Sequence, residues 1–128
     1  MTFQKVAWCD RARVDLERIA DVSKRDLEIF RGGVESGRFC LFSIISEGAR
    51  LGSVVWSLEH EPDGLNVVVN AAAVEGGARV FEALWDAFTT LARSIGAATV
   101  TCWTERPGLA RKLERRGARF KYVSQVEI

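Results

Sequence analysis

The alternation of apolar and polar residues predicts a run of short strands in the middle of the chain. Three segments rich in β-branched and aromatic residues, 38–46, 51–59 and 65–74, are separated by turn-forming residues. The first separator is a tight turn at 47–49, and the second is the stretch 60–64 with its Pro and Asp-Gly. We therefore expect three antiparallel strands in sequence order, with a loop over 60–64 that forms the second hairpin turn.

The segment before these strands is predicted to hold one strand and two helices. The expected elements are a strand over 3–8, a helix over 11–20 capped by Asp10, and a helix that begins at a capping box of Ser23 and Asp26 and stops at Gly37. The diglycine Gly32-Gly33 is expected to weaken this second helix or to end it early.

The segment after these strands is predicted to begin with a long amphipathic helix. The apolar stripe of this helix, which is expected over 77–95, consists of Val80, Leu84, Phe88, Leu91 and Ile95. A strand over 98–104, a helix over 107–116 and a strand over 119–128 are expected to follow. Because a helix then joins two strands, we expect a right-handed crossover and local parallel pairing.

The resulting order is β-α-α-β-β-β-α-β-α-β, which indicates the α/β (α+β) class. The chain has 128 residues, of which 48% are hydrophobic, enough for one core and too few for two domains. We therefore expect a single domain over 1–128, with a mixed, mostly antiparallel sheet and helices on both faces.

Charge and cysteine content narrow the classes of partner. The net charge of +1 gives no overall field toward nucleic acid or membrane, although seven basic residues and one acid lie between Arg106 and Lys121. A solvated helix face explains most of that cluster, because only Phe120 and Tyr122 stand near it for stacking on bases. The three cysteines form no CxxC pair and the chain has one histidine, so we expect reduced thiols, a cytoplasmic protein and no metal site. The longest apolar stretches, such as 39–45, are too short to span a membrane.

The order of elements, with the diglycine Gly76-Gly77 between a strand and the long helix, resembles the GNAT family of acyl-CoA-dependent N-acyltransferases. The resemblance covers nearly the whole chain and implies acetyl-CoA as cofactor and an amine as acceptor. In that fold, the turn at the diglycine holds the pyrophosphate of the cofactor. The stretch 10–28, which includes Ser23-Lys-Arg-Asp-Leu-Glu28, also resembles short GNAT-like proteins of bacteriophage and prophage genomes.

The turn at the diglycine has the physical properties of an anion site. A helix N-terminus presents unpaired N–H groups with a partial positive charge, and glycines let the backbone approach an anion closely. The expected cofactor-binding groups are the backbone N–H groups of Gly76, Gly77, Ala78 and Arg79, and the resemblance adds Val74, whose backbone would face the pantetheine arm. The turn is shorter than the family's, no basic residue stands three positions before Gly76, and Glu75 should repel a pyrophosphate. The alternative is that the diglycine only lets the chain turn sharply.

The residues that would carry the chemistry in the family are missing here. Family members commonly have an Asn and a Tyr near the last helix, and the Tyr protonates the departing thiolate. Aligned on Gly117, these positions fall near Arg106 and on Leu113, and the chain's single tyrosine, Tyr122, lies in the predicted last strand. Glu59, His60 and Glu61 at a hairpin could supply a base, although such a loop is ordinarily solvated. No catalytic residue is assigned.

The family fold also implies an acyl site where two neighbouring strands splay apart. We expect this opening between 65–74 and 98–104, lined by Asn70, Val74, Cys102 and Trp103. The leading interpretation is an N-acyltransferase-like protein that binds acetyl-CoA with degenerate motifs. One alternative is a non-catalytic GNAT-like, phage-related protein that binds a partner or assembles. The other is a nucleic-acid-binding module, an interpretation that rests only on the basic cluster. The acceptor amine and a homodimer stay open.

Overall fold

The computed structural model describes residues 1–19, 22–102 and 107–117, with the side chains of 78 and 107–110 left out of the description. Its elements are β1 (Thr2–Val6), α1 (Asp10–Glu17), α2 (Lys24–Glu35), β2 (Cys40–Ser46), β3 (Ala49–Glu61), β4 (Gly64–Val74), α3 (Ala78–Ser94), β5 (Ala97–Cys102) and α4 (Pro107–Arg115). The predicted last strand over 119–128 lies outside the described residues. Among the helices of the described part, none is long and apolar enough to cross a membrane.

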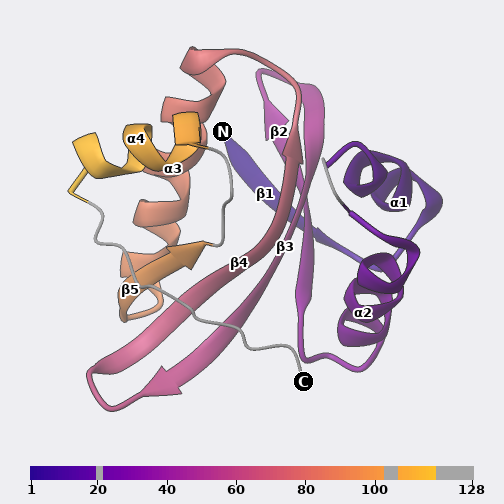
Figure 1. Cartoon of the computed structure of the whole chain (residues 1–128), viewed down its shortest axis with the longest axis horizontal. Helices are drawn as coiled ribbons and strands as arrows, with labels where there is room; N and C mark the ends of the chain where they lie inside the picture. Colours follow the sequence, from indigo (N-terminus) through magenta and orange to yellow (C-terminus); the bar gives the residue numbers. More distant parts are fainter. Residues whose placement is uncertain (20–21, 103–106, 118–128) are drawn as a thin grey trace.

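The strands form one mixed sheet in the order β1-β2-β3-β4-β5 (Figure 1). The first four strands pair antiparallel, and β4 pairs parallel with β5 through the α3 crossover. The predicted meander of three antiparallel strands and the parallel pair are therefore confirmed. Helices α1 and α2 lie on one side of the sheet and α3 and α4 on the other, so the prediction of helices on both faces is also correct (Figure 1).

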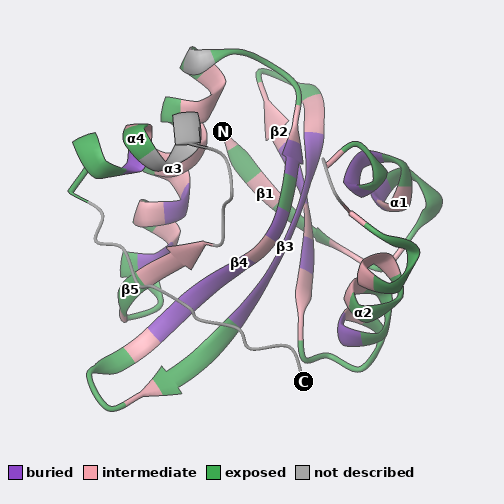
Figure 2. Cartoon of the chain, viewed as in Figure 1, coloured by how far each residue is buried: buried purple, intermediate pink, exposed green. Residues whose placement is uncertain are grey.

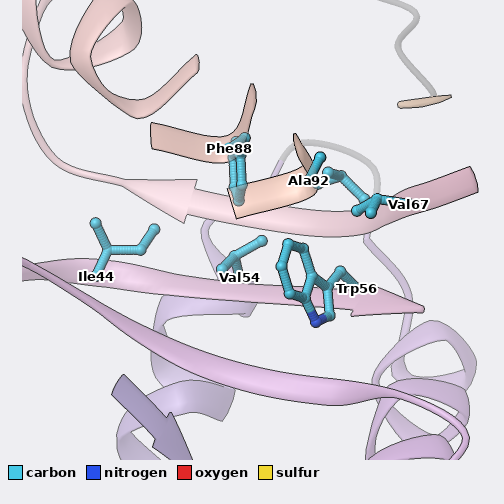
Figure 3. Close-up of a cluster of buried hydrophobic side chains, with 7 residues drawn as sticks. Ile44, Val54, Trp56, Val67, Phe88 and Ala92 are labelled. Carbon is cyan, nitrogen blue, oxygen red and sulfur yellow. The ribbon is translucent and has the colours of Figure 1, made fainter. Parts of the chain in front are cut away.

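Side chains on β3 alternate between two hydrophobic clusters, one on each face of the sheet. Val54 and Trp56 pack toward Phe88 and Ala92 of α3, as Figure 3 shows. Val55 points the other way and packs in the cluster that includes Leu16 of α1. Buried residues accordingly gather in the middle of β3 and β4, while the outer faces of the helices are exposed (Figure 2). This two-sided burial fixes the register of the central strands.

Two predicted details of the N-terminal helices change in the structure. Cys9, not Asp10, is the N-cap of α1, and no side chain caps that end. The capping box of α2 is confirmed, because Ser23 Oγ accepts from the Asp26 N–H at 3.1 Å and Asp26 Oδ2 accepts from the Ser23 N–H at 2.9 Å. Gly33 does not end α2, which continues to Glu35. This glycine is buried against Phe39, and a Cβ atom there would lie 2.1 Å from the ring, so the close packing requires glycine.

The hairpin loop predicted over 60–64 is present but shorter than expected. The β3–β4 ladder continues through the pairs His60↔Leu65 and Glu61↔Gly64, which leaves only Pro62 and Asp63 between the strands. A two-residue connection is sufficient here because Gly64 takes a φ of +126°, which favours glycine. The hairpin is therefore longer than the turn residues suggested.

Candidate functional site

A β-bulge at Asn70 divides β4 into two halves. Trp56 of β3 pairs with Val69, whereas its neighbour Val55 pairs with Ala71, so Asn70 is an extra residue on β4. The Asn70 side chain donates from Nδ2 to Ser57 Oγ at 3.0 Å and to the Val68 carbonyl oxygen at 3.3 Å. A bulge of this kind bends its strand and disturbs the ladder locally.

The described part of the parallel ladder between β4 and β5 reaches the residue before the bulge. Its last pair in the described part of the chain is Val69↔Cys102, although β4 continues to Val74 along β3. A cavity of about 630 Å³ opens in this region, a volume typical of small-molecule sites. Its walls are mostly apolar and come from β4, α3, β5 and α4, with Val69, Leu84, Trp85, Phe88 and Leu113 among the lining residues.

The cavity lies where the sequence predicted the splayed strands. Val74 and Cys102 line it, as expected. Asn70 is not among its lining residues, because its amide is used within the bulge. Trp103 lies outside the described residues. The prediction of the opening therefore placed two of its residues at the cavity and misassigned the role of Asn70.

The two glycines of the turn line the cavity but have different roles. Gly76 has a φ of +128°, and a Cβ atom there would lie 2.3 Å from Val80 Cγ2, so the backbone requires glycine. Gly77 is the N-cap of α3 with a φ of −99°, no side chain caps the helix there, and a Cβ atom would meet nothing within 4 Å. The first N–H groups of α3 thus have no side-chain cap at the N-terminus of the helix, next to the two glycines of the lining.

The predicted cofactor-binding residues lie along the end of β4 and the first turn of α3. Val74, Gly76 and Gly77 line the cavity, whereas the Arg79 side chain is exposed and is not part of the lining. The backbone of Ala78 opens α3, while its side chain is outside the description. The prediction for Arg79 concerns its backbone N–H group, which belongs to the first turn of α3.

Arg18 is a cation at the cavity that sequence reasoning missed. It follows α1, lines the cavity and donates from Nη1 to Glu75 Oε1 at 2.7 Å. The hydrogen bond to Glu75 raises the pKa of Arg18, and the bond to Asp15 adds to that shift against the opposing effect of burial. Because 57 residues separate Arg18 from Glu75, no local motif could have indicated this contact.

Behind Arg18 lies a buried ionic network. Asp15 is only 5% exposed; its Oδ1 accepts from Arg18 Nη2 and its Oδ2 pairs with Arg50 Nη2, both at 2.7 Å. Ser53 Oγ also donates to Asp15 Oδ2, at 2.7 Å. Burial raises the pKa of Asp15, but the hydrogen bonds from Arg50 and Ser53 and the charge of Arg50 outweigh it, so the pKa of Asp15 is lowered. Asp15 is therefore ionised at neutral pH and holds Arg18 in place.

The cavity lining offers little of the expected acid–base chemistry. Leu113, at the position where the family has its proton-donating tyrosine, is buried and lines the cavity. Burial raises the pKa of the Cys102 thiol, so the thiolate needed for a nucleophile is disfavoured at neutral pH. Glu59, His60 and Glu61 lie at the far end of the β3–β4 hairpin and are absent from the lining.

The basic helix α4 is tied to α3 by charge pairs. Arg116, just after α4, donates to Glu82 and Asp86 of α3, and Lys112 lies with its Nζ 5.1 Å from the centroid of the Phe81 ring. Lys112 also lines the cavity. Within the described ranges, no group of three or more His, Cys, Asp or Glu side chains is arranged to hold a metal ion.

Comparison with known proteins gives a fold and no close relative. No protein-family model and no curated protein matches the chain by sequence. A putative acetyl transferase from Pyrococcus furiosus is similar in structure, with a TM-score of 0.69, 18% identity and coverage of 93% of this chain and 91% of the other. A ribosomal-protein-alanine N-acetyltransferase from Brucella melitensis biovar Abortus 2308 gives a TM-score of 0.64 at 17% identity, covering 100% and 98%.

The chain has the GNAT fold. The fold resemblance inferred from the order of elements is thereby confirmed. A transcriptional regulator from Bacillus halodurans C-125 is also similar in structure, with a TM-score of 0.69, 12% identity and coverage of 99% and 98%. At such identities the likeness concerns the fold, and the activity has to be argued from the site.

Proposed function

We propose that this GNAT-fold chain binds acetyl-CoA, or a related acyl-CoA, in the cavity between β4, β5 and α3. The observation that supports this most directly is the continuity of the cavity, which runs from Val69 and Cys102, the last pair of the β4–β5 ladder among the described residues, to the diglycine at α3. An elongated ligand with an acyl thioester at one end and a diphosphate further along matches this arrangement. The apolar walls suit the acyl end, and the uncapped helix N-terminus suits the diphosphate.

The open half of β4 suits the arm that joins these two ends. Backbone groups of 70–74 that point away from β3 have no β5 partner in the described part of the chain. Backbone N–H and C=O groups away from water require hydrogen-bond partners, and the amides of a pantetheine arm can supply them in the manner of an added strand. Val74, which lines the cavity at the end of β4, is where this arm would pass toward Gly76 and Gly77.

The proposed reaction is transfer of the acyl group to an amine. The neutral amine nitrogen attacks the thioester carbonyl carbon, so that a C–N bond forms and the C–S bond breaks. The acylated nitrogen then loses a proton to solvent, and the departing thiolate takes one up from solvent. Leu113 has no proton to give to the thiolate, so the position that the resemblance assigns to the family's tyrosine would supply no general acid. General acid–base catalysis typically contributes about 10²–10⁴-fold in rate, so we expect slow turnover.

A second function is favoured by the same residue. Leu113 in the cavity wall offers no proton, and burial raises the pKa of the Cys102 thiol. The site therefore suits binding of an acyl-CoA better than transfer of its acyl group. We therefore propose a non-catalytic acyl-CoA-binding protein as the alternative to the transferase.

Calorimetry and thermal melting with acetyl-CoA test the binding that both functions share. We expect a rise in melting temperature, and no rise with the adenosine moiety alone. The absence of heat and of a melting shift at millimolar acetyl-CoA, about −4 kcal/mol of binding free energy, would remove both functions. Mass spectrometry of a panel of amines after incubation with acetyl-CoA then separates them, because only the transferase produces an acylated amine above the rate without protein.

A further inference from the structure

The Arg18–Glu75 pair lies beside the turn at the diglycine. Arg18 lines the same cavity as Gly76 and Gly77, and Glu75 directly precedes them in the chain. A carboxylate next to a helix N-terminus competes with any anion for the same positive potential. In this structure Glu75 is matched by the guanidinium of Arg18, at 2.7 Å. The positive charge of Arg18 therefore offsets the negative charge of Glu75 beside the turn.

We propose that Arg18 is the residue that binds the diphosphate of the acyl-CoA, and that Glu75 holds its place until the ligand arrives. This inference rests on the proposed function and adds the residue that reads the anion. A guanidinium forms paired hydrogen bonds with phosphate oxygens as it does with a carboxylate, so the ligand can replace Glu75 without rearranging Arg18. Arg18 thus supplies the cation that the shortened turn lacks in sequence.

The two acidic partners of Arg18 differ in the way this exchange requires. The Asp15 side chain is 7% exposed and is also held by Arg50 and Ser53, whereas the Glu75 side chain is 68% exposed. An exposed ion pair contributes little to stability and is readily exchanged. Asp15 therefore keeps the guanidinium oriented while Glu75 can swing into solvent.

Other cations fit this role less well. Arg79 is exposed and its side chain is absent from the cavity lining. Lys112 does line the cavity, but it lies over the Phe81 ring and comes from α4. Arg18 is joined directly to the residue before the diglycine, which places it at the turn itself.

The test compares Arg18→Gln with wild type, using calorimetry with CoA, with pantetheine and with inorganic pyrophosphate. We expect Arg18→Gln to weaken CoA and pyrophosphate binding by about tenfold and to leave pantetheine unchanged, since pantetheine has no diphosphate. The dependence of CoA affinity on salt should also become shallower. Glu75→Gln should strengthen CoA binding, because it removes the competing carboxylate.

Arg13→Gln is the matched control. Arg13 lies on α1 itself, has a similarly exposed side chain, 43% against 47% for Arg18, and pairs with Asp10 and Glu17 away from the cavity lining. It should bind all three ligands as wild type does. Arg18→Lys keeps the charge without the planar fork and should give an intermediate affinity, which preserves the test if Arg18→Gln folds poorly.

The outcomes separate this inference from the proposed function. If Arg18→Gln binds CoA as tightly as wild type, the role of Arg18 is overturned while the acyl-CoA site stands. If wild type binds pyrophosphate in an Arg18-dependent way but does not bind CoA, the anion site stands and the proposed function is overturned. If wild type binds neither ligand, both are overturned.

Discussion

The two halves of β4 differ in how they are held. From Leu65 to Val69 the strand pairs with β3 on one side and β5 on the other, and Val67 and Val68 are buried. Beyond Asn70 it keeps β3 alone among the described strands, borders the cavity and rests on α1, where Ala71 and Ala73 pack. The first half is a core strand, and the second forms a wall of the cavity. One inserted residue separates the two.

This difference also divides the forces that stabilise the two halves. The closed half is held mainly by apolar packing, together with hydrogen bonds that Thr99 and Thr101 donate to the buried Asn66 amide, and none of these groups titrates near neutral pH. The open half packs against α1, which carries Asp15. The Asp15 carboxylate pairs with Arg50 and accepts a hydrogen bond from Ser53, and both of these residues lie on β3. We therefore expect the two halves to respond differently to pH and to substitution.

The largest effect is expected on removal of the buried carboxylate. Asp15→Ala leaves Arg50 and Arg18 without their shared anion, and we expect a loss of about 3 kcal/mol in the free energy of unfolding at neutral pH. The fold lowers the pKa of Asp15, so its contribution is fully present above its unfolded pKa and is lost as pH falls through the folded pKa.

Urea unfolding between pH 3 and 8 measures this contribution. The difference between wild type and Asp15→Ala should be constant above about pH 5 and should shrink below about pH 4. A difference independent of pH across this range would show that Asp15 acts through packing and not through its charge.

A somewhat smaller effect is expected in the closed half. Val67 is fully buried in the cluster with Ala92 of α3, as Figure 3 shows, so Val67→Ala should cost about 2–3 kcal/mol. This loss should be the same at every pH at which the protein folds, and acetyl-CoA affinity should be unchanged. Val74→Ala in the open half is the matched substitution.

The matched substitution should give the opposite pattern. Val74 is only partly buried and lines the cavity, so Val74→Ala should cost about 1 kcal/mol or less in stability and should weaken ligand binding. Equal effects of the two alanine variants on both unfolding and binding would remove the functional distinction between the halves.

Deletion of Asn70 tests the bulge directly. Without it, Ala71 can follow Val69 in a regular ladder, opposite its present partner Val55, so both hydrophobic faces keep their side of the sheet. We expect a stability change of about 1 kcal/mol, from the lost hydrogen bond to Ser57, and loss of acetyl-CoA binding because β4 straightens toward β5. A deletion variant that still binds would show that the bulge does not open the site.

The sequence predicted the elements better than it predicted the site. Apolar periodicity and turn residues located every described element, and the crossover helix correctly indicated the parallel pair. Where boundaries failed, as at His60 and Glu61, the cause was pairing across the sheet, which overrides local loop preference. The bulge at Asn70 could not be predicted, because a strand with one extra residue has the same strand-forming composition as a regular strand.

The site could be predicted only where it is local in sequence. Val74, Gly76 and Gly77 lie together in the chain and line the cavity, so the order of elements was sufficient to find them. Arg18 reaches the turn from α1, and its position depends on Asp15, Arg50 and the packing of α1 on the sheet. The separation of Arg18 and Glu75 along the chain also explains why Glu75 was predicted only to repel a pyrophosphate: its ion pair with Arg18 could not be seen in the sequence.

The smallest effect on stability is expected at the end of the open half, at Gly77. This N-cap residue has extended backbone angles and open space around it, so Gly77→Asp can cap α3 without strain and should stabilise the unliganded protein by about 0.5–1 kcal/mol. Its carboxylate would occupy the helix N-terminus and repel a diphosphate, so acetyl-CoA binding should be lost while pantetheine binding remains. Gly77→Asn caps in the same way without the charge and should retain most of the affinity. Thermal melting of both variants with and without ligand measures the cap and the binding together; a Gly77→Asp variant that binds acetyl-CoA as wild type does would place the diphosphate away from this helix, and the turn would then serve the fold alone.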